Sequence, residues 1–482
     1  MRDCLPAPSS PRRRDDLIAF NEQEYGLRLL GLDVPDAAAL REAENRRAEL
    51  LADLDFFAAC GCHGTKLDIN HLSPGCRICV DGGWSCLFIN GRCNGGCFYC
   101  PAPQNEIGSP GANGLEFTEP QRYVRYLERF GFSGASISGG EPLLTPERTL
   151  AFVAAIKKRF GQALHLWLYS NGILADYDTL AALADAGLDE MRFDIGATAY
   201  RLDAARRAAA LMPTVTVEIP AIPEEEERLK SLLPQLRDAG VKHLNLHQLR
   251  LTPHNYERLQ PRGYRWLHGE KVTSLDSELT ALSVLRHSLV ERIGVPVNYC
   301  SFPYKYRFQG RAARRRCAAF LREPTETLTD NGFLRSLSLL DAAARLDALV
   351  ARWRHSAKPE HLFKRDSGER LRLHPDLLTD CTDGDAGGLT SASLRVEYRV
   401  AYQRQRVSGR LAFREVALAD DDSVFIEEER ATVAFTLDAA RTRQFAEMFL
   451  QAKTPPPAPD DDRLWADMLD FERPRRGLQE YF

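Results

Sequence analysis

The residues best suited to chemistry are three cysteines in the stretch CNGGCFYC, residues 93–100. Cys93, Cys97 and Cys100 follow a C-x3-C-x2-C spacing, and no fourth cysteine stands beside them. A 4Fe-4S cluster has four irons and is normally held by four thiolates. Three protein ligands leave one iron open, as a catalytic zinc keeps one position open for water or substrate. The spacing therefore predicts a reactive iron-sulfur site, with a structural zinc or an unrelated iron-sulfur site as the alternative.

A second motif, ISGGEPLL, occupies residues 137–144 at the end of a predicted strand. Gly139 and Gly140 have no Cβ, so the backbone there can run close against a ligand. Taken alone, Gly-Gly-Glu-Pro is equally compatible with an ordinary strand-to-helix turn. Its position after the cysteine motif, on the expected element, favours a binding role.

With these two motifs in this order, the chain resembles the radical SAM superfamily, which has an aromatic residue, here Tyr99, before the third cysteine. The resemblance implies that Cys93, Cys97 and Cys100 hold three irons while S-adenosylmethionine chelates the fourth. It also implies reductive cleavage of that cofactor to a 5'-deoxyadenosyl radical, which abstracts hydrogen from an unidentified substrate in biosynthesis or modification. The hard chemistry then belongs to the cofactor, and the protein orients it.

The resemblance also assigns cofactor contacts. Glu141 is expected to accept a charge-assisted hydrogen bond from the ammonium group of S-adenosylmethionine. Other polar residues near strand ends are either cofactor contacts or hydrogen-bonding residues of the barrel. The full set of candidate cofactor-binding residues is Tyr99, Gly139, Gly140, Glu141, Pro142, Ser170, Asn171, Asp194, Glu218 and His247.

A second group of cysteines precedes the motif. Its members are Cys60, Cys62, Cys76, Cys79 and Cys86. A C-x2-C pair lets two sulfurs meet one metal, and a second pair upstream can complete four ligands. We expect a second metal site, either an iron-sulfur cluster or zinc, formed by four of these cysteines. Packed reduced thiols, or one reactive sulfur, are the alternatives.

Composition places the chain among soluble globular proteins. It has 482 residues, 44% hydrophobic and 27% charged, with a formal net charge of -4. This balance argues against a surface devoted to nucleic acid or anionic membrane. We expect a cytoplasmic protein, because no apolar signal segment follows the N-terminal arginines and no run reaches roughly 18 apolar residues. Twelve cysteines in a reducing compartment point to metal ligation rather than disulfides.

Short apolar strands alternate with amphipathic helical segments from residue 86 onward, which is typical of parallel βα units. Seven strands are expected at residues 86–90, 135–138, 164–170, 191–195, 214–220, 243–249 and 295–301. They predict a partial or complete parallel β/α barrel with its chemistry at the carboxyl ends of the strands. Strands with apolar and polar alternation at residues 394–402 and 424–437 predict a separate antiparallel sheet.

The expected organisation has five parts. They are a helical N-terminal extension (1–59), a Cys-rich second metal module (60–86), the radical SAM barrel (87–322), a C-terminal α+β domain (323–452) and a Pro-rich linker and tail (453–482).

The substrate and partners are less well defined by the sequence. We expect a small-molecule or peptide substrate and an electron donor resembling flavodoxin or ferredoxin, and neither nucleic acid nor membrane. The basic segment 305–316 is interpreted as a solvated helix face. Polar residues around the sixth strand are candidates for the substrate side: His243, Asn245, His247, Gln248 and His254. Alternative functions are a glycyl-radical-type activase of a partner protein, or a non-catalytic cysteine module that binds zinc or nucleic acid.

Overall fold

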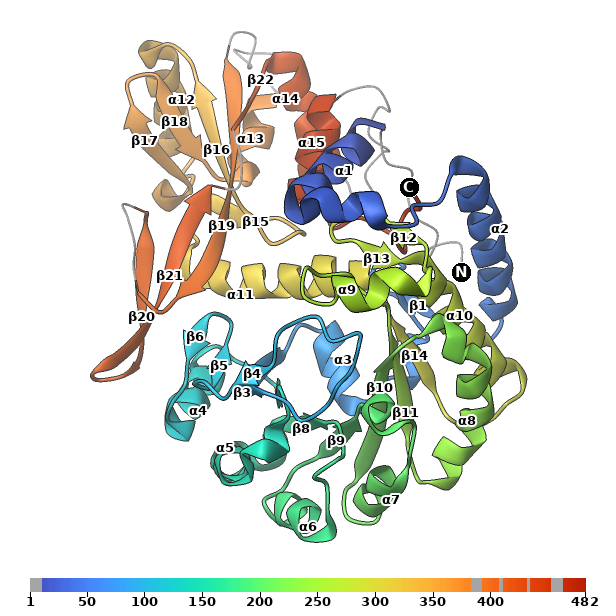
Figure 1. Ribbon diagram of the computed structural model, residues 1–482. Helices are drawn as coiled ribbons and strands as arrows, with labels where there is room; N and C mark the ends of the chain where they lie inside the picture. The colour runs from blue at the N-terminus through green and yellow to red at the C-terminus, as the bar shows by residue number, and fades with distance from the viewer. Residues whose placement is uncertain (1–10, 383–391, 407–410, 431–433, 452–462) are drawn as a thin grey trace. The chain divides into compact units, whose positions relative to one another are not determined.

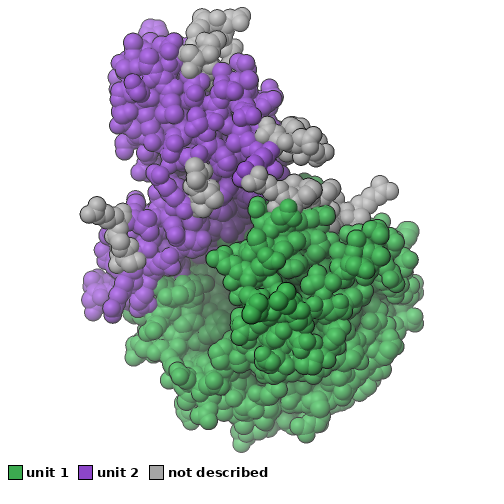
Figure 2. All heavy atoms as spheres, turned by 45° about the horizontal axis from the view of Figure 1, so that its top comes forward, with its two compact units in different colours: residues 1–310, 475–482 green, residues 311–474 purple. Residues whose placement is uncertain are grey.

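The structure is a computed structural model. It describes residues 11–382, 392–406, 411–430, 434–451 and 463–482. They form two compact units, coloured separately in Figure 2: residues 1–310 with 475–482, and residues 311–474. The predicted Pro-rich linker falls mainly on residues 452–462, outside the described residues. The five-part organisation stays a prediction.

The first unit is built on the seven parallel strands predicted from the sequence. They are β3 (Trp84–Arg92), β7 (Gly134–Gly139), β8 (His165–Ser170), β9 (Glu190–Phe193), β10 (Thr214–Pro220), β11 (His243–His247) and β14 (Val297–Cys300). Each pairs in parallel with the next, so their order in the sheet follows their order in the sequence. Consecutive residues such as Leu166, Trp167 and Leu168 are all buried. Burial on both faces is the reason these strands read as continuous apolar runs.

These strands curve into a partial barrel, seen in the lower part of Figure 1. Short antiparallel strands occupy both of its edges: β2 (Lys66–Leu67) pairs with β14, and β5 (Gly111–Ala112) pairs with β3. No pairing between β3 and β14 occurs among the strands that the structure describes. The predicted barrel is therefore confirmed in its partial form, and the complete ring is not formed.

Helices connect the parallel strands and lie outside the curved sheet (Figure 1). They are α4 (Pro120–Arg129), α5 (Pro146–Phe160), α6 (Tyr177–Asp185), α7 (Asp203–Ala209), α8 (Glu226–Asp238) and α10 (Leu275–Val290). Each presents an apolar side to the sheet, as Leu229, Leu232 and Leu236 of α8 illustrate by their burial. This outer layer fixes the strand ends at which the site is built.

One short helix, α3 (Pro74–Val80), precedes the first parallel strand and packs against β7 and β8. Ser73 caps its N-terminus, with the side-chain oxygen accepting from the Cys76 amide at 3.2 Å. Pro74 occupies the first helical position, where the missing amide hydrogen costs nothing. The Cys-rich segment thus enters the barrel as a helix that carries Cys76 and Cys79.

The predicted helical N-terminus consists of α1 (Pro11–Tyr25) and α2 (Ala37–Leu54), joined by a 3-10 turn, Gly26–Gly31. Helix α2 packs against α10. Between them Arg47 donates to Glu278 at 3.0 Å, and Tyr481 from the C-terminal tail donates to the same carboxylate at 2.8 Å. This buried polar contact ties both ends of the chain to the first unit.

The second unit contains the predicted antiparallel sheet, ordered β17-β18-β16-β19-β21-β20. Its strands are β16 (Leu334–Leu340), β17 (Phe363–Ser367), β18 (Arg370–Leu373), β19 (Ser393–Arg404), β20 (Phe413–Ala419) and β21 (Asp422–Arg430), with β15 (Glu326–Leu328) and β22 (Phe435–Leu437) at the side. The sheet packs with helices α12 (Ala343–His355), α13 (Pro375–Thr382), α14 (Ala439–Phe445) and α15 (Arg463–Glu472) around one apolar core. The expected strand at 424–437 is two strands, and residues 431–433 between them lie outside the described part.

Helices of the described residues are all too short or too polar to cross a lipid bilayer.

Candidate functional site

A cavity of about 750 Å³ opens in the first unit at the carboxyl ends of the parallel strands. Residues of the two sequence motifs line it, among them Cys93, Cys97, Cys100 and Gly140. Its wall combines aromatic side chains such as Trp167 with charged ones such as Arg192 and Glu218. The cavity is large enough to hold a nucleotide cofactor together with part of a substrate.

The three cysteines lie on the loop that follows β3. The Gly95 amide donates to the Cys93 sulfur at 3.3 Å, and the Asn171 side chain reaches the same sulfur at 3.6 Å. Burial raises the pKa of Cys97 to about 11, and burial also raises that of Cys100. Thiols of this kind become good ligands only when a metal replaces the proton. Three sulfurs in one cavity wall fit a cluster held by three thiolates.

A single metal ion and an iron-sulfur cluster require different positions of their ligand atoms. Among the described residues, no three His, Cys, Asp or Glu side chains lie close enough to enclose one ion. Cluster thiolates bind different irons of the cube and need not converge on one point. The described side chains therefore form no ready-made single-ion site at this loop.

Two side chains from outside the cysteine loop hold its backbone in place. Arg258 donates to the Cys97 carbonyl at 3.2 Å, and Asn255 donates to the Tyr99 carbonyl at 3.2 Å. Both residues follow β11 in the chain, far from the cysteines in sequence. These contacts fix the direction of the loop without using the sulfurs.

The two glycines of the second motif fit against β3 rather than only against a ligand. A Cβ at Gly139 would lie 2.2 Å from the Asn90 carbonyl oxygen, and one at Gly140 would lie 2.0 Å from that of Arg92. The Gly140 amide donates to Asn90 at 2.9 Å, and the Glu141 amide donates to Arg92 at 2.7 Å. The glycines therefore join the end of β7 to the strand end that leads into Cys93.

Glu141 is fully buried and lies away from the cavity wall, as does Pro142. Its carboxylate accepts from the Leu143 amide at 2.9 Å, the Ser170 hydroxyl at 2.9 Å and the Asn171 amide at 2.7 Å. Burial raises its pKa. The carboxylate thus bridges the GGEP loop and the end of β8, and the expected contact between Glu141 and a ligand ammonium stays a prediction.

Ser170 and Asn171 end strand β8 as expected and line the cavity. The Ser170 hydroxyl bonds to Glu141, and the Asn171 side chain donates to Asn94 at 2.7 Å. Asn171 therefore connects the cysteine loop with the third strand of the sheet. Ser170 is linked to the GGEP loop by its hydrogen bond to Glu141.

Tyr99 and Asp194 form a pair at the cavity wall. The Tyr99 hydroxyl donates to the two Asp194 carboxylate oxygens at 2.8 and 3.0 Å, and the Gly196 amide donates to one of them at 3.1 Å. Burial raises the pKa of Asp194 to about 6, although these donors oppose the shift. The structure therefore brings the aromatic residue of the cysteine motif to the end of β9.

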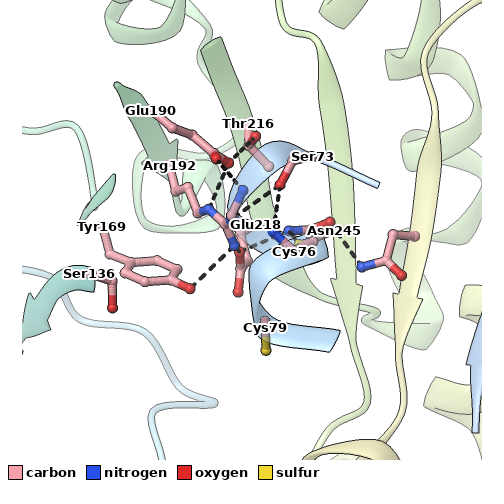
Figure 3. A network of polar contacts seen from close by, with 12 residues as sticks. Ser73, Cys76, Cys79, Ser136, Tyr169, Glu190, Arg192, Thr216, Glu218 and Asn245 are labelled. Atoms are coloured by element: carbon pink, nitrogen blue, oxygen red, sulfur yellow. Dashed lines mark hydrogen bonds and ion pairs between the residues drawn. The ribbon is translucent and has the colours of Figure 1, made fainter. Parts of the chain in front are cut away.

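A chain of charged residues crosses the cavity wall from β9 to the segment after β14. Arg192 donates to Glu190 at 2.8 Å and to Glu218 at 2.7 Å (Figure 3). His247 contacts the other oxygen of Glu218 at 2.6 Å and is also hydrogen-bonded to the Lys305 ammonium. Burial alone raises the pKa of Glu218, but Arg192 and His247 hold it well below its ordinary value. Glu218 and His247 line the cavity as expected, within a network rather than as isolated contacts.

The cysteines of the second group are divided by the structure. Cys60 is disulfide-bonded, so we leave it out of any ligand set. Cys76, Cys79 and Cys86 line the same cavity as the first motif. Burial raises the pKa of both Cys79 and Cys86 to about 11. Cys62 lies in the turn between β1 (Cys60–Gly61) and β2.

Several functional residues were missed by the sequence reasoning. Arg192 carries a charge within the otherwise apolar strand MRFDI, a signal that could have identified it. Lys66, Cys300 and Lys305 also line the cavity, but no spacing in the sequence marks them. Of the expected substrate-side residues, Asn245, His247, Gln248 and His254 line the cavity and His243 does not.

Comparisons with known proteins show what this chain is similar to. A family model described as the radical SAM superfamily matches residues 87–199. A Methanocaldococcus jannaschii protein named "Putative glycyl-radical enzyme activating enzyme" is 29% identical over 287 residues, covering 57% of this chain and 75% of that protein.

Two solved structures are also similar. SuiB of Streptococcus suis bound to S-adenosylmethionine is 13% identical with a TM-score of 0.33, covering 44% of this chain and 48% of that one. The methyltransferase TsrM of Kitasatospora setae is 17% identical with a TM-score of 0.30, covering 38% and 39% respectively. The match therefore spans less than half the length of each of these two structures.

Proposed function

Because this chain belongs to the radical SAM superfamily of enzymes, we propose that Cys93, Cys97 and Cys100 hold its 4Fe-4S cluster beside bound S-adenosylmethionine. When bound, these groups supply reductive cleavage to a 5'-deoxyadenosyl radical, which takes a hydrogen atom from the substrate. The observation that carries the proposal is one cavity lined by all three cysteines and by Gly139 and Gly140 of the GGEP loop. The earlier alternative of a non-catalytic cysteine module is set aside, since the chain is an enzyme.

The residues of this chain position the reacting groups. The Asn90 and Arg92 carbonyls accept from the GGEP loop, so the cysteine loop and the cofactor loop are held as one piece. Asn171 donates toward the Cys93 sulfur and reduces its basicity as a ligand. Glu141 acts as a positioning residue, because its three hydrogen bonds hold the ends of β7 and β8 together.

The charged network forms the polar part of the cavity wall. Lys305 and His247 line the wall there; His247 contacts Glu218 through one ring nitrogen and the Lys305 ammonium through the other. Burial and Lys305 lower the pKa of His247, so its ring is neutral near neutral pH. We propose that this wall binds a polar small molecule or a peptide backbone. The electron donor stays a prediction, with flavodoxin or ferredoxin as the class.

The test is anaerobic reconstitution with iron and sulfide, addition of dithionite and S-adenosylmethionine, and measurement of 5'-deoxyadenosine. We expect the wild type to form it and Cys97→Ala to lose the activity. Cys317→Ala, which replaces a buried thiol of the second unit, is the matched control and is expected to behave as wild type. An iron-loaded wild type that leaves the cofactor intact would refute the proposal.

A second candidate function is favoured by the name of the Methanocaldococcus relative. In that case the hydrogen would come from a glycine Cα of a partner protein, and the stable product would be a glycyl radical. Incubating the reduced enzyme with extract of its host and recording the electron paramagnetic resonance spectrum distinguishes the two. A persistent protein radical supports the activase, and a modified small molecule or peptide supports the first proposal.

A further inference from the structure

Four thiols from three separate segments lie near one buried lysine, Lys66. Cys62 lies in the β1–β2 turn, Cys76 and Cys79 lie one turn apart on α3, and Cys300 ends β14. Cys300 pairs directly with Lys66 across the β14–β2 ladder. Cys76, Cys79, Cys300 and Lys66 all line the cavity, so the group is part of its wall.

Two of the sulfurs are already surrounded by hydrogen-bond donors. Asn245 donates to the Cys76 sulfur at 3.2 Å, and Figure 3 shows these two side chains next to each other. The Tyr304 hydroxyl and the Gln309 amide each donate to the Cys79 sulfur at 3.2 Å. Donors aimed at cysteine sulfur stabilise a thiolate and tune the potential of a cluster bound to it. A protonated thiol has little need of two such donors.

Lys66 supplies a second, independent observation. It is 1% exposed, and its ammonium lies 4.2 Å from the centre of the Tyr304 ring. No ion pair with a carboxylate is formed by its ammonium among the described residues, and Lys66 lines the cavity. An anion bound at this place would balance its charge.

The thiols are the groups near enough to provide that anion. Cys76, Cys79 and Cys300 line the cavity together with Lys66, and Cys300 pairs with Lys66 across the β14–β2 ladder. A 4Fe-4S cluster with four thiolate ligands carries a net negative charge. It would balance the lysine, whereas a proton on each sulfur would leave the ammonium without a partner.

We propose that Cys62, Cys76, Cys79 and Cys300 hold a second 4Fe-4S cluster, fully ligated by protein, beside the ammonium of Lys66. A single zinc with four thiolate ligands is the rival occupant, and metal analysis of the variants below distinguishes it from a cluster. The ligand set differs from the sequence expectation by including Cys300 and leaving out Cys60 and Cys86. The proposal does not depend on the radical chemistry of the first cluster.

Cys86 is the natural rival as a ligand, because it lies on β3 at the same cavity. Cys86 pairs with Ser136 of β7. Strand β3 lies at the other end of the row of parallel strands from β14, which carries Cys300. Cys86 therefore serves as the matched control for Cys300.

The experiment starts from the triple variant Cys93→Ala, Cys97→Ala, Cys100→Ala, reconstituted anaerobically with iron and sulfide. We expect it to retain about four irons per chain with a 4Fe-4S spectrum. Adding Cys300→Ala is expected to remove this iron, and adding Cys86→Ala is expected to leave it. Retention of zinc alone, loss of all iron from the folded triple variant, or the opposite dependence on Cys86 and Cys300 would each overturn the proposal.

A second variant covers the case in which Cys300→Ala does not fold. Lys66→Met in the triple background keeps every proposed ligand but removes the adjacent positive charge. We expect the iron to stay and the reduction potential of the cluster to become more negative, because the oxidised state is then relatively favoured. An unchanged potential contradicts the placement. Deoxyadenosine formation by the otherwise wild-type chain reports separately on the first proposal.

Discussion

Gly140→Ala tests whether the two sequence motifs are held together as described. The added Cβ would lie 2.0 Å from the Arg92 carbonyl oxygen, 2.3 Å from its carbon and 2.8 Å from its nitrogen. Real Cβ contacts with backbone are essentially never shorter than 3.0 Å. The GGEP loop and the strand end before Cys93 must therefore separate by about 1 Å, because all three contacts are with backbone atoms of Arg92 and none is with a flexible side chain.

The expected effect follows from that displacement. Forcing extra atoms into a packed site costs about 1–3 kcal/mol of stability. Misplacing a reacting group by about 1 Å can lower the rate by about 10²-fold. We therefore expect 5'-deoxyadenosine formation to fall by about 10²-fold and the free energy of unfolding to fall by about 1–3 kcal/mol.

The assay pairs anaerobic deoxyadenosine formation with thermal unfolding and iron content. Gly368→Ala is the control, because a Cβ there meets nothing within 4 Å and its φ is ordinary. It is expected to match wild type in all three measurements. A Gly140→Ala enzyme with the wild-type rate and stability would show that the loop and β3 are not packed in this way.

Three further outcomes are expected from the buried charges. Glu190→Gln should destabilise the fold by about 3–5 kcal/mol, because the buried guanidinium of Arg192 then loses the negative charge of this partner. Arg192 and His165 outweigh burial and hold the pKa of Glu190 at about 2. The stability that the ionised Glu190 contributes is therefore fully present above its ordinary pKa of 4.5 and is lost as pH falls toward 2. Urea unfolding at several pH values should show a weaker pH dependence in the variant. Tyr99→Phe removes a hydrogen-bond donor from Asp194, whose pKa burial already raises to about 6. A raised carboxyl pKa makes the folded state less stable as pH rises from about 4 to 6, and in the variant this decline should continue to higher pH. An unchanged stability profile would count against the Tyr99–Asp194 pair. Lys305→Met should raise the pKa of His247, since Lys305 lowers it, and nuclear magnetic resonance titration of the ring would detect the change.

The sequence by itself determined the kind of fold and the catalytic motif. Period-two and continuous apolar runs, separated by amphipathic segments, placed all seven parallel strands, because local side-chain patterning reflects which faces are buried. The C-x3-C-x2-C spacing identified Cys93, Cys97 and Cys100 because one short loop carries all three. The strand-end rule also placed Ser170 and Asp194 near the site.

Only the tertiary structure decided which distant residues complete the site. Cys300 stands alone in the sequence, and it meets Lys66 because an antiparallel strand joins the open edge of the barrel. Glu141 bridges the GGEP loop and the end of β8, because its carboxylate accepts from Leu143, Ser170 and Asn171. Such contacts join residues far apart along the chain, and no local period or spacing encodes them.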